Sequence, residues 1–286
     1  MPTERGIKTK HSDYTDIQDQ WEKLRDIFGG QRDVKDAGTK YLPKLGGQTS
    51  EQYEAYKKRG TFFNVTGHTA DAFEGLVFRK DPLMNLPDNL LELQNDLSLK
   101  DETAKGFGKR LVRETLRLGR AGILVDFPRV EDDGATTQAE AEQRGENPYL
   151  TLYKSEEIRN WHVQREGGNT ELKALILNEQ FENQDGYFGV DVEEQYRLLE
   201  IVGEDDDTAP TGVYRQQIWR KSKADDESGF FLHSEVIPRI GGEPLRQIPF
   251  TFCGKSNTTS ELESPPLMDL AEVNLSHYRS QADLEH

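Results

Sequence analysis

The six histidines of this 286-residue chain are the residues best suited to metal binding and proton transfer, and they are scattered along the sequence. None of them forms the H-E-x-x-H pattern that places two zinc ligands on one face of a helix. His162 adjoins Trp161, and we interpret it as a structural histidine and not a catalytic one. The histidines therefore predict neither a metal centre nor a catalytic base.

The chain also lacks the local patterns that bind nucleotides or activate a nucleophile. It contains no G-x-x-x-x-G-K-[ST] loop for phosphate and no G-x-S-x-G elbow for a reactive serine. Its single cysteine, Cys253, follows the apolar run Ile248–Phe252, where a thiol is inert. We expect no cofactor, no covalent catalysis and no enzymatic activity.

Carboxylates are the remaining candidates for chemistry. The acidic runs Glu204–Asp207 and Asp225–Glu227 do not match a calcium-binding loop, and such runs are usually solvated turn tips, so a cation site is the less favoured interpretation. Carboxylate catalysis needs only two carboxylates at the right distance, and that distance cannot be read from the sequence. A hydrolase is therefore kept as a third hypothesis, behind the two structural roles described below. Its catalytic pair would come from Glu156, Glu157, Asp191 and Glu193.

One set of cations has regular spacing along a predicted helix. Its members are four residues apart, with one more just beyond on nearly the same side: Lys105, Lys109, Arg113, Arg117 and Arg120. This spacing predicts a basic stripe along one helix face. The simplest interpretation is a solvated face; the alternatives are a subunit interface or a DNA-facing surface. In a chain this acidic, a subunit contact is the better of these two.

Composition limits the partners further. Acidic residues outnumber basic ones 52 to 36, which gives a net charge of −16. This charge disfavours a sequence-reading DNA-binding protein, although passive contact with DNA stays possible. The N-terminal sequence lacks the apolar run of a secretory signal, and no apolar stretch approaches the ~20 residues that cross a bilayer. We expect a protein of a reducing cytoplasm with no membrane segment.

The elements that must position these residues are mostly helical in the first part of the chain. Apolar periodicity predicts helices at 13–28, 69–78 and 102–118, and Thr49 with Gln52 has the spacing of a capping box that begins another. Residues 37–47 read as a loop, because Pro43 forbids a regular helix there. We expect residues 1–120 to form a helical N-terminal region.

The second part reads as β-rich. Strands are predicted at 121–127, 149–153, 172–181, 194–202, 213–221, 230–237 and 248–252, with turn-forming clusters at hairpin spacing between them. Residues 131–147 have almost no apolar side chain and are predicted to be an exposed insertion within the region 121–255. Ser264 and the prolines after it begin a helix over 264–286 that has no stop signal, so we expect it to continue. The predicted class is α+β, with an antiparallel β-rich middle.

Several segments, taken in order, resemble the phage portal proteins, in a branch long known only as a phage-related domain of unknown function. The early segments are the helix with Trp21, the sequence AGTKYLPKL at 37–45, residues 53–67 ending in NVTG, and GLVFRK at 75–80. The later ones are GRAGILVDFP at 119–128, residues 158–161, IPF at 248–250, PPLMDLA at 265–271, NL at 274–275, HYR at 277–279 and ADLEH at 282–286.

This resemblance implies a ring-shaped connector, usually of twelve subunits, at one vertex of a tailed-phage capsid. DNA enters and leaves through the ring, terminase docks on it during packaging, and tail or adaptor proteins dock afterwards. It implies a wing-like role for residues 1–120, assembly in the host bacterial cytoplasm and residence in the virion. Family members continue well past the equivalent of His286. The alternative is another head–tail adaptor or tail protein without a DNA tunnel.

Overall fold

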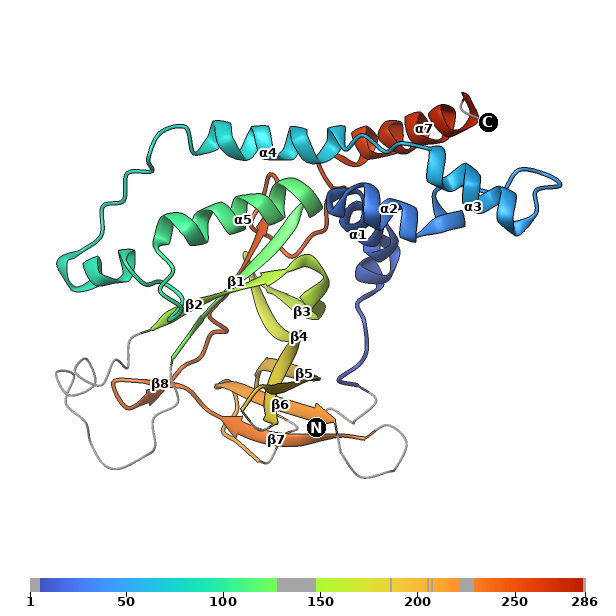
Figure 1. The fold of residues 1–286 in the computed structure, drawn as a ribbon. Helices are drawn as coiled ribbons and strands as arrows, with labels where there is room; N and C mark the ends of the chain where they lie inside the picture. Colours follow the sequence, from blue (N-terminus) through green and yellow to red (C-terminus); the bar gives the residue numbers. More distant parts are fainter. Residues whose placement is uncertain are drawn as a thin grey trace. The chain divides into compact units, whose positions relative to one another are not determined.

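The computed structural model describes residues 6–127, 148–185, 187–204, 206, 208–221 and 229–284. It divides into two compact units that each combine separate stretches of the chain. The helical unit contains the described residues of 17–121, 127–152 and 253–286, and the β unit contains those of 1–16, 122–126 and 153–252. The molecule is an α+β protein, as predicted (Figure 1).

The helical unit is built from short and medium helices, the first of which begins within the residues of the β unit. In chain order they are α1 Ser12–Gly29, α2 Gln31–Asp36, the 3-10 turn η1 Gly38–Lys40, α3 Ser50–Arg59, α4 Val65–Val77, the 3-10 turn η2 Asp88–Gln94, α5 Ala104–Leu118 and α7 Met268–Leu284. Trp21, Leu24 and Ile27 of α1 are fully buried, and the Trp21 indole N–H donates to the Leu118 carbonyl at 3.1 Å. The apolar stripe that predicted α1 is therefore the face that forms the core.

Local signals placed most helix ends correctly. The Thr49 hydroxyl accepts from the Gln52 N–H and the Gln52 side chain accepts from the Thr49 N–H, which confirms the capping box. Gly119 ends α5 with a φ of 81°, a left-handed conformation that favours glycine. The prediction for α4 began too late, because the Asn64 side chain caps this helix by accepting from the Gly67 N–H.

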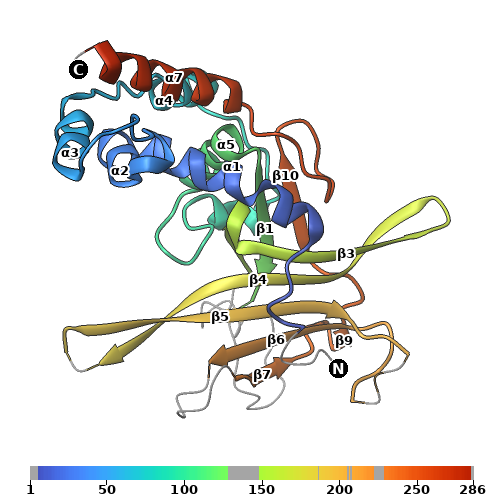
Figure 2. The same ribbon diagram turned by 90° about the vertical axis from the view of Figure 1, so that its right-hand side faces the viewer.

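The β unit is organised around a five-stranded antiparallel sheet whose strands follow in chain order. They are β3 Ile158–Glu166, β4 Asn169–Asp185, β5 Gly189–Ile201, β6 Tyr214–Lys221 and β7 Phe230–Val236 (Figure 2). A small hairpin pairs β8 Arg239–Ile240 with β9 Glu243–Pro244. The predicted antiparallel arrangement is confirmed, whereas β3 was not predicted.

A third sheet has the order β10–β1–β2, from β1 Arg120–Asp126, β2 Tyr149–Lys154 and β10 Phe250–Gly254. The division between the two units falls within these three strands. Gly122 of β1 is required by close packing, since an added Cβ would lie 2.2 Å from the Phe250 ring.

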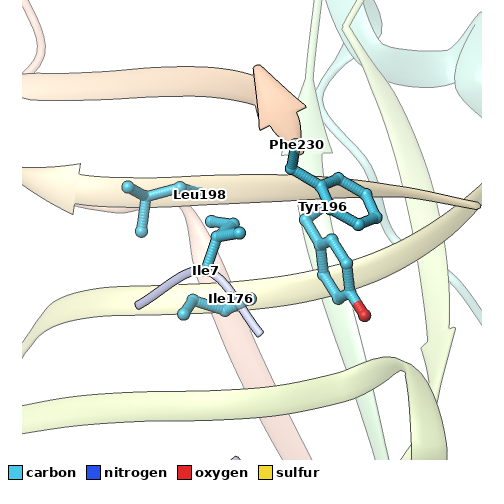
Figure 3. Close-up of a cluster of buried hydrophobic side chains, with 5 residues drawn as sticks. All are labelled: Ile7, Ile176, Tyr196, Leu198 and Phe230. Carbon is cyan, nitrogen blue, oxygen red and sulfur yellow. The ribbon is translucent and has the colours of Figure 1, made fainter. Parts of the chain in front are cut away.

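The core of the β unit includes a residue from the start of the chain. Ile7 is fully buried among Ile176, Tyr196, Leu198 and Phe230 (Figure 3). Ile176 and Leu198 are opposite one another on β4 and β5, and the rings of Tyr196 and Phe230 meet edge to face with centroids 5.0 Å apart.

The two units do not contain the same stretches of the chain as the regions expected from the sequence. The start of the chain belongs to the β unit, and α7 belongs to the helical unit with the early helices, so neither unit is one continuous segment. The change from helix to strand after Gly119 lies where it was expected. The predicted insertion at 131–147 lies outside the described residues.

Candidate interaction surface on the helical unit

The predicted basic stripe lies on α5, and α4 packs beside it (Figure 1). Lys105, Lys109, Arg113 and Arg117 all lie within this single helix, as their spacing required. Arg120 does not belong to the stripe: it is the first residue of β1 and only 3% exposed. The prediction that Arg120 extends this surface is therefore corrected, because the helix ends at Gly119 and the chain changes direction there.

Carboxylates from α4 and the segment after it meet the stripe. Arg113 donates two hydrogen bonds to the Glu74 carboxylate, at 2.8 and 2.9 Å, and the Arg117 guanidinium bonds Asp71 at 3.0 Å. Lys105 pairs with Asp81. The bond to Glu74 raises the pKa of Arg113, and the ammonium of Lys105 lowers the pKa of Asp81. Three of the four cations are thus paired with carboxylates of the helical unit.

A shallow hollow lies between α4 and α5. It is lined by Asp71, Glu74, Gly75, Phe78, Lys109, Arg113 and Arg117. Lys109 is exposed and stands over the Phe78 ring, 5.8 Å from its centroid. Within the described part of the chain Lys109 has no ion pair, so it is the cation of the stripe available to a partner.

The exposed face of α4 is apolar. Phe73, Leu76 and Val77 are 43%, 63% and 56% exposed, and Val65 at the start of the helix is 39% exposed. These residues recur at helical spacing on one side of α4. We call them the α4 apolar face. Periodicity predicted a helix here but could not tell a buried apolar face from a binding face.

Three of the segments that resemble portal proteins, at 37–45, 53–67 and 274–286, meet around α7. The buried Asn274 amide accepts from the Thr66 N–H and hydroxyl at 3.2 and 3.1 Å and donates to the Phe63 carbonyl at 2.9 Å. Arg279 donates to the Tyr41 carbonyl at 2.8 Å, and the Tyr56 hydroxyl bonds Asp283 at 2.5 Å. Residues more than 200 positions apart are therefore joined by specific hydrogen bonds.

Gly60 shows how closely α7 approaches this framework. An added Cβ at Gly60 would lie 3.0 Å from the Ala282 Cβ and 3.1 Å from the Tyr278 ring. Burial raises the pKa of Tyr278 to about 12. We call this set of contacts between residues 41–66 and α7 the α7 framework.

The structure separates Glu156 and Glu157 from Asp191 and Glu193, the other two carboxylates considered for hydrolysis. Glu156 and Glu157 precede Ile158, which is opposite Leu177 of β4, whereas Asp191 is opposite Asn183. Leu177 and Asn183 are six residues apart on one strand, which is roughly 20 Å. The Glu157 carboxylate instead accepts from the Lys154 N–H at 2.7 Å.

The acidic run after β5 has a structural partner. Asp206 accepts from Arg215 at 2.5 Å and from Thr208, and these hydrogen bonds lower its pKa, with Thr208 the larger cause. Arg215 is 1% exposed and also bonds Glu200 of β5. Asp206 thus ties the β5–β6 connection to the sheet. The run Asp225–Glu227 lies outside the described residues.

Other candidate residues stand alone. His162 is exposed on β3, opposite Ala174, and Cys253 is half-buried in β10, where burial raises the pKa of its thiol. Among the described residues, no group of three His, Cys, Asp or Glu side chains is arranged to hold a metal ion. No helix in the described part of the chain is long and apolar enough to cross a membrane.

Comparison with known proteins gives no assignment. No model of a protein family matches the sequence, and no curated protein matches it.

Proposed function

We propose that this chain is a structural subunit of a phage portal ring, which forms the DNA channel at one capsid vertex and docks terminase, then tail or adaptor proteins. The observation that carries the proposal is the α7 framework. The segments that resemble portal proteins are distant in sequence, yet Tyr41, Tyr56 and Phe63 bond directly to residues of α7. The resembling segments at 37–45, 53–67 and 274–286 are thus joined in one piece of structure.

The surface of the helical unit supports an assembling role. Phe73, Leu76 and Val77 lie exposed together on one helix of a chain with a net charge of −16. Contiguous apolar patches on soluble proteins mark interaction sites. A subunit of a closed ring needs such surfaces, because each copy must bury one face against its neighbour on either side.

The acidic charge is compatible with a channel for DNA of any sequence. A tunnel that lets duplex DNA slide must not hold its phosphates strongly. The arginines of the basic stripe, Arg113 and Arg117, are engaged with Glu74 and Asp71, so neither is a free cation for phosphates. We expect assembled rings to bind free duplex weakly at physiological salt in a filter-binding assay; tight, steeply salt-dependent binding would argue against a sliding channel.

The decisive experiment is the oligomeric state of the full-length protein. Negative-stain images and native mass spectrometry should show closed rings with a central hole. A monomer that persists at high concentration would overturn the proposal. Localisation on virions distinguishes the two roles. A portal subunit would lie within the capsid vertex, whereas a head–tail adaptor or tail protein without a tunnel would lie on the tail side of it.

A further inference from the structure

The hairpin between β4 and β5 extends beyond the sheet that supports it (Figure 2). β3 pairs with β4 only as far as Leu177, and β6 pairs with β5 only from Gln195 onward. The β4–β5 ladder continues past both limits to the pair Asp185 and Gly189. We call residues 182–185 and 187–193 the β4–β5 arm; within the described residues it is a ribbon of two strands without a third.

The end of the β4–β5 arm carries aromatic side chains in water. Tyr187 and Phe188 are 93% and 99% exposed, and Val190 and Val192 behind them are each more than half exposed. A two-stranded ribbon is only marginally stable alone, and four exposed apolar side chains do not help it fold. Exposed aromatic residues at a protruding tip are typical of anchors that fill a partner's pocket or groove.

Charge selects the kind of partner. The β4–β5 arm includes Glu182, Asp191 and Glu193, and residues 182–194 contain no lysine or arginine. Such a surface repels nucleic-acid phosphates and anionic lipid headgroups. Its counterpart should be an apolar protein surface with a basic border.

This chain itself has a surface of that kind. The α4 apolar face presents Phe73, Leu76 and Val77, and the cations Arg79, Lys80 and Lys109 lie exposed at its C-terminal end. In the described part of the chain, Arg79 and Lys80 have no ion pair.

We propose that the β4–β5 arm of one copy docks on the α4 apolar face of the next copy. The inference rests on the proposed function, because a ring needs a contact between two different surfaces of the same chain, and these two are complementary in both apolar character and charge. Tyr187 and Phe188 would supply the buried contact, and Asp191 and Glu193 would face the basic border.

Photo-crosslinking tests the contact directly. The full-length protein is made with p-benzoylphenylalanine in place of Phe188, and cross-linked peptides are identified by mass spectrometry after irradiation. We expect an intermolecular product that maps to residues 65–84. A product that maps to another part of the chain, or no product between copies, would overturn the inference.

Charge reversal tests the pairing of the two surfaces. Asp191→Lys with Glu193→Lys, and separately Arg79→Glu with Lys80→Glu, should each lower the assembled fraction in sedimentation velocity at least tenfold at a fixed concentration. The four substitutions together should restore assembly, which general destabilisation would not do. Asp16→Lys with Asp19→Lys, at two exposed positions on α1, is the charge-matched control and should assemble normally.

Removal of the aromatic tip tests its contribution. Tyr187→Ser with Phe188→Ser should prevent assembly, whereas Ile240→Ser, at a position 58% exposed on β8, should not. Rings that form normally with the serine tip would reject the arm contact and leave the portal proposal standing. Cross-linked assemblies that are open or dimeric would instead support the contact and reject the closed ring.

Discussion

Asn274 illustrates how one side chain can hold a helix in place. It is 4% exposed, and its amide serves Thr66 at the start of α4 and the Phe63 carbonyl before it. The first N–H groups of a helix have no acceptor within the helix, so the Asn274 side chain of α7 supplies an acceptor for the Thr66 N–H. Loss of this amide would leave buried polar groups without a partner, which costs free energy.

We predict that Asn274→Ala lowers the free energy of unfolding by about 2–3 kcal/mol, because it leaves the buried Thr66 N–H and Phe63 carbonyl without their partner. Chemical denaturation measures the loss. Val273→Ala is the neighbouring control, since Val273 is 65% exposed, and it should change stability by less than about 0.5 kcal/mol. Equal losses for the two variants would contradict the role given to the Asn274 amide.

Two arginine–glutamate pairs on the helical unit should differ in energy because their arginines differ in exposure to water. The Glu114 side chain is 11% exposed and accepts from Arg25 at 3.2 and 2.5 Å. The Glu74 side chain is almost as buried, at 13%, but its partner Arg113 is 46% exposed, against 32% for Arg25. Water screens an exposed pair, whereas loss of a buried partner also leaves a desolvated charge.

We therefore expect Glu114→Ala to lower the free energy of unfolding by about 2 kcal/mol, and Glu74→Ala by less than about 1 kcal/mol. Both changes replace glutamate with alanine inside a helix, so each controls for helix propensity in the other. Urea titrations of the two variants give the comparison. A larger loss at Glu74 would mean that the stripe contributes more to stability than its exposure suggests.

At the scale of elements, the capping box of α3 is the clearest link from sequence to structure. Thr49 and Gln52 exchange hydrogen bonds of 3.2 and 2.8 Å at an exposed helix start. A local motif of this kind forms wherever its residues occur before a helix, so sequence alone could predict it.

Thr49→Ala should lower the free energy of unfolding by about 1 kcal/mol, because the Gln52 N–H loses its acceptor. Thr49→Ser keeps the hydroxyl and should retain most of that stability. Thermal denaturation followed by circular dichroism can resolve the difference. If the serine variant is as unstable as alanine, the hydroxyl is not the source of the effect.

Elements that depend on distant partners were harder to predict. Among the β3 residues whose burial is described, only Ile158 and Trp161 are buried, so the apolar pattern is weak. The strand forms because β4 offers a strand edge beside it. The sequence around Ile7 likewise gave no indication that this residue would pack in the core of the β unit.

At the scale of the whole molecule, buried tyrosines should make both units sensitive to alkali. Burial, and then a hydrogen bond to Glu194, raises the pKa of Tyr196 in the β unit to about 12, and burial raises that of Tyr278 in the helical unit to about 12. The ordinary value is 10.0. A raised pKa means that the folded state holds the proton more tightly than the unfolded state.

The stabilisation from these tyrosines should therefore be complete below pH 10 and decline as pH rises from 10 through about 12. Denaturant midpoints measured between pH 9 and pH 11.5 would show the decline. Tyr196→Phe should reduce this pH dependence, since the ring stays buried without a titrating hydroxyl. An unchanged midpoint up to pH 11.5 would contradict the prediction.

The sequence by itself determined the features that depend on near neighbours: the class, the capping box at Thr49, the end of α5 at Gly119 and most strands. Capping, periodicity and glycine conformation act over a few residues and can be read directly. Only the tertiary structure decided that Arg120 is buried, that Arg113 and Arg117 pair with α4, and that α7 packs with the early helices. These outcomes depend on partners far away in the chain, and spacing along the sequence carries no information about them.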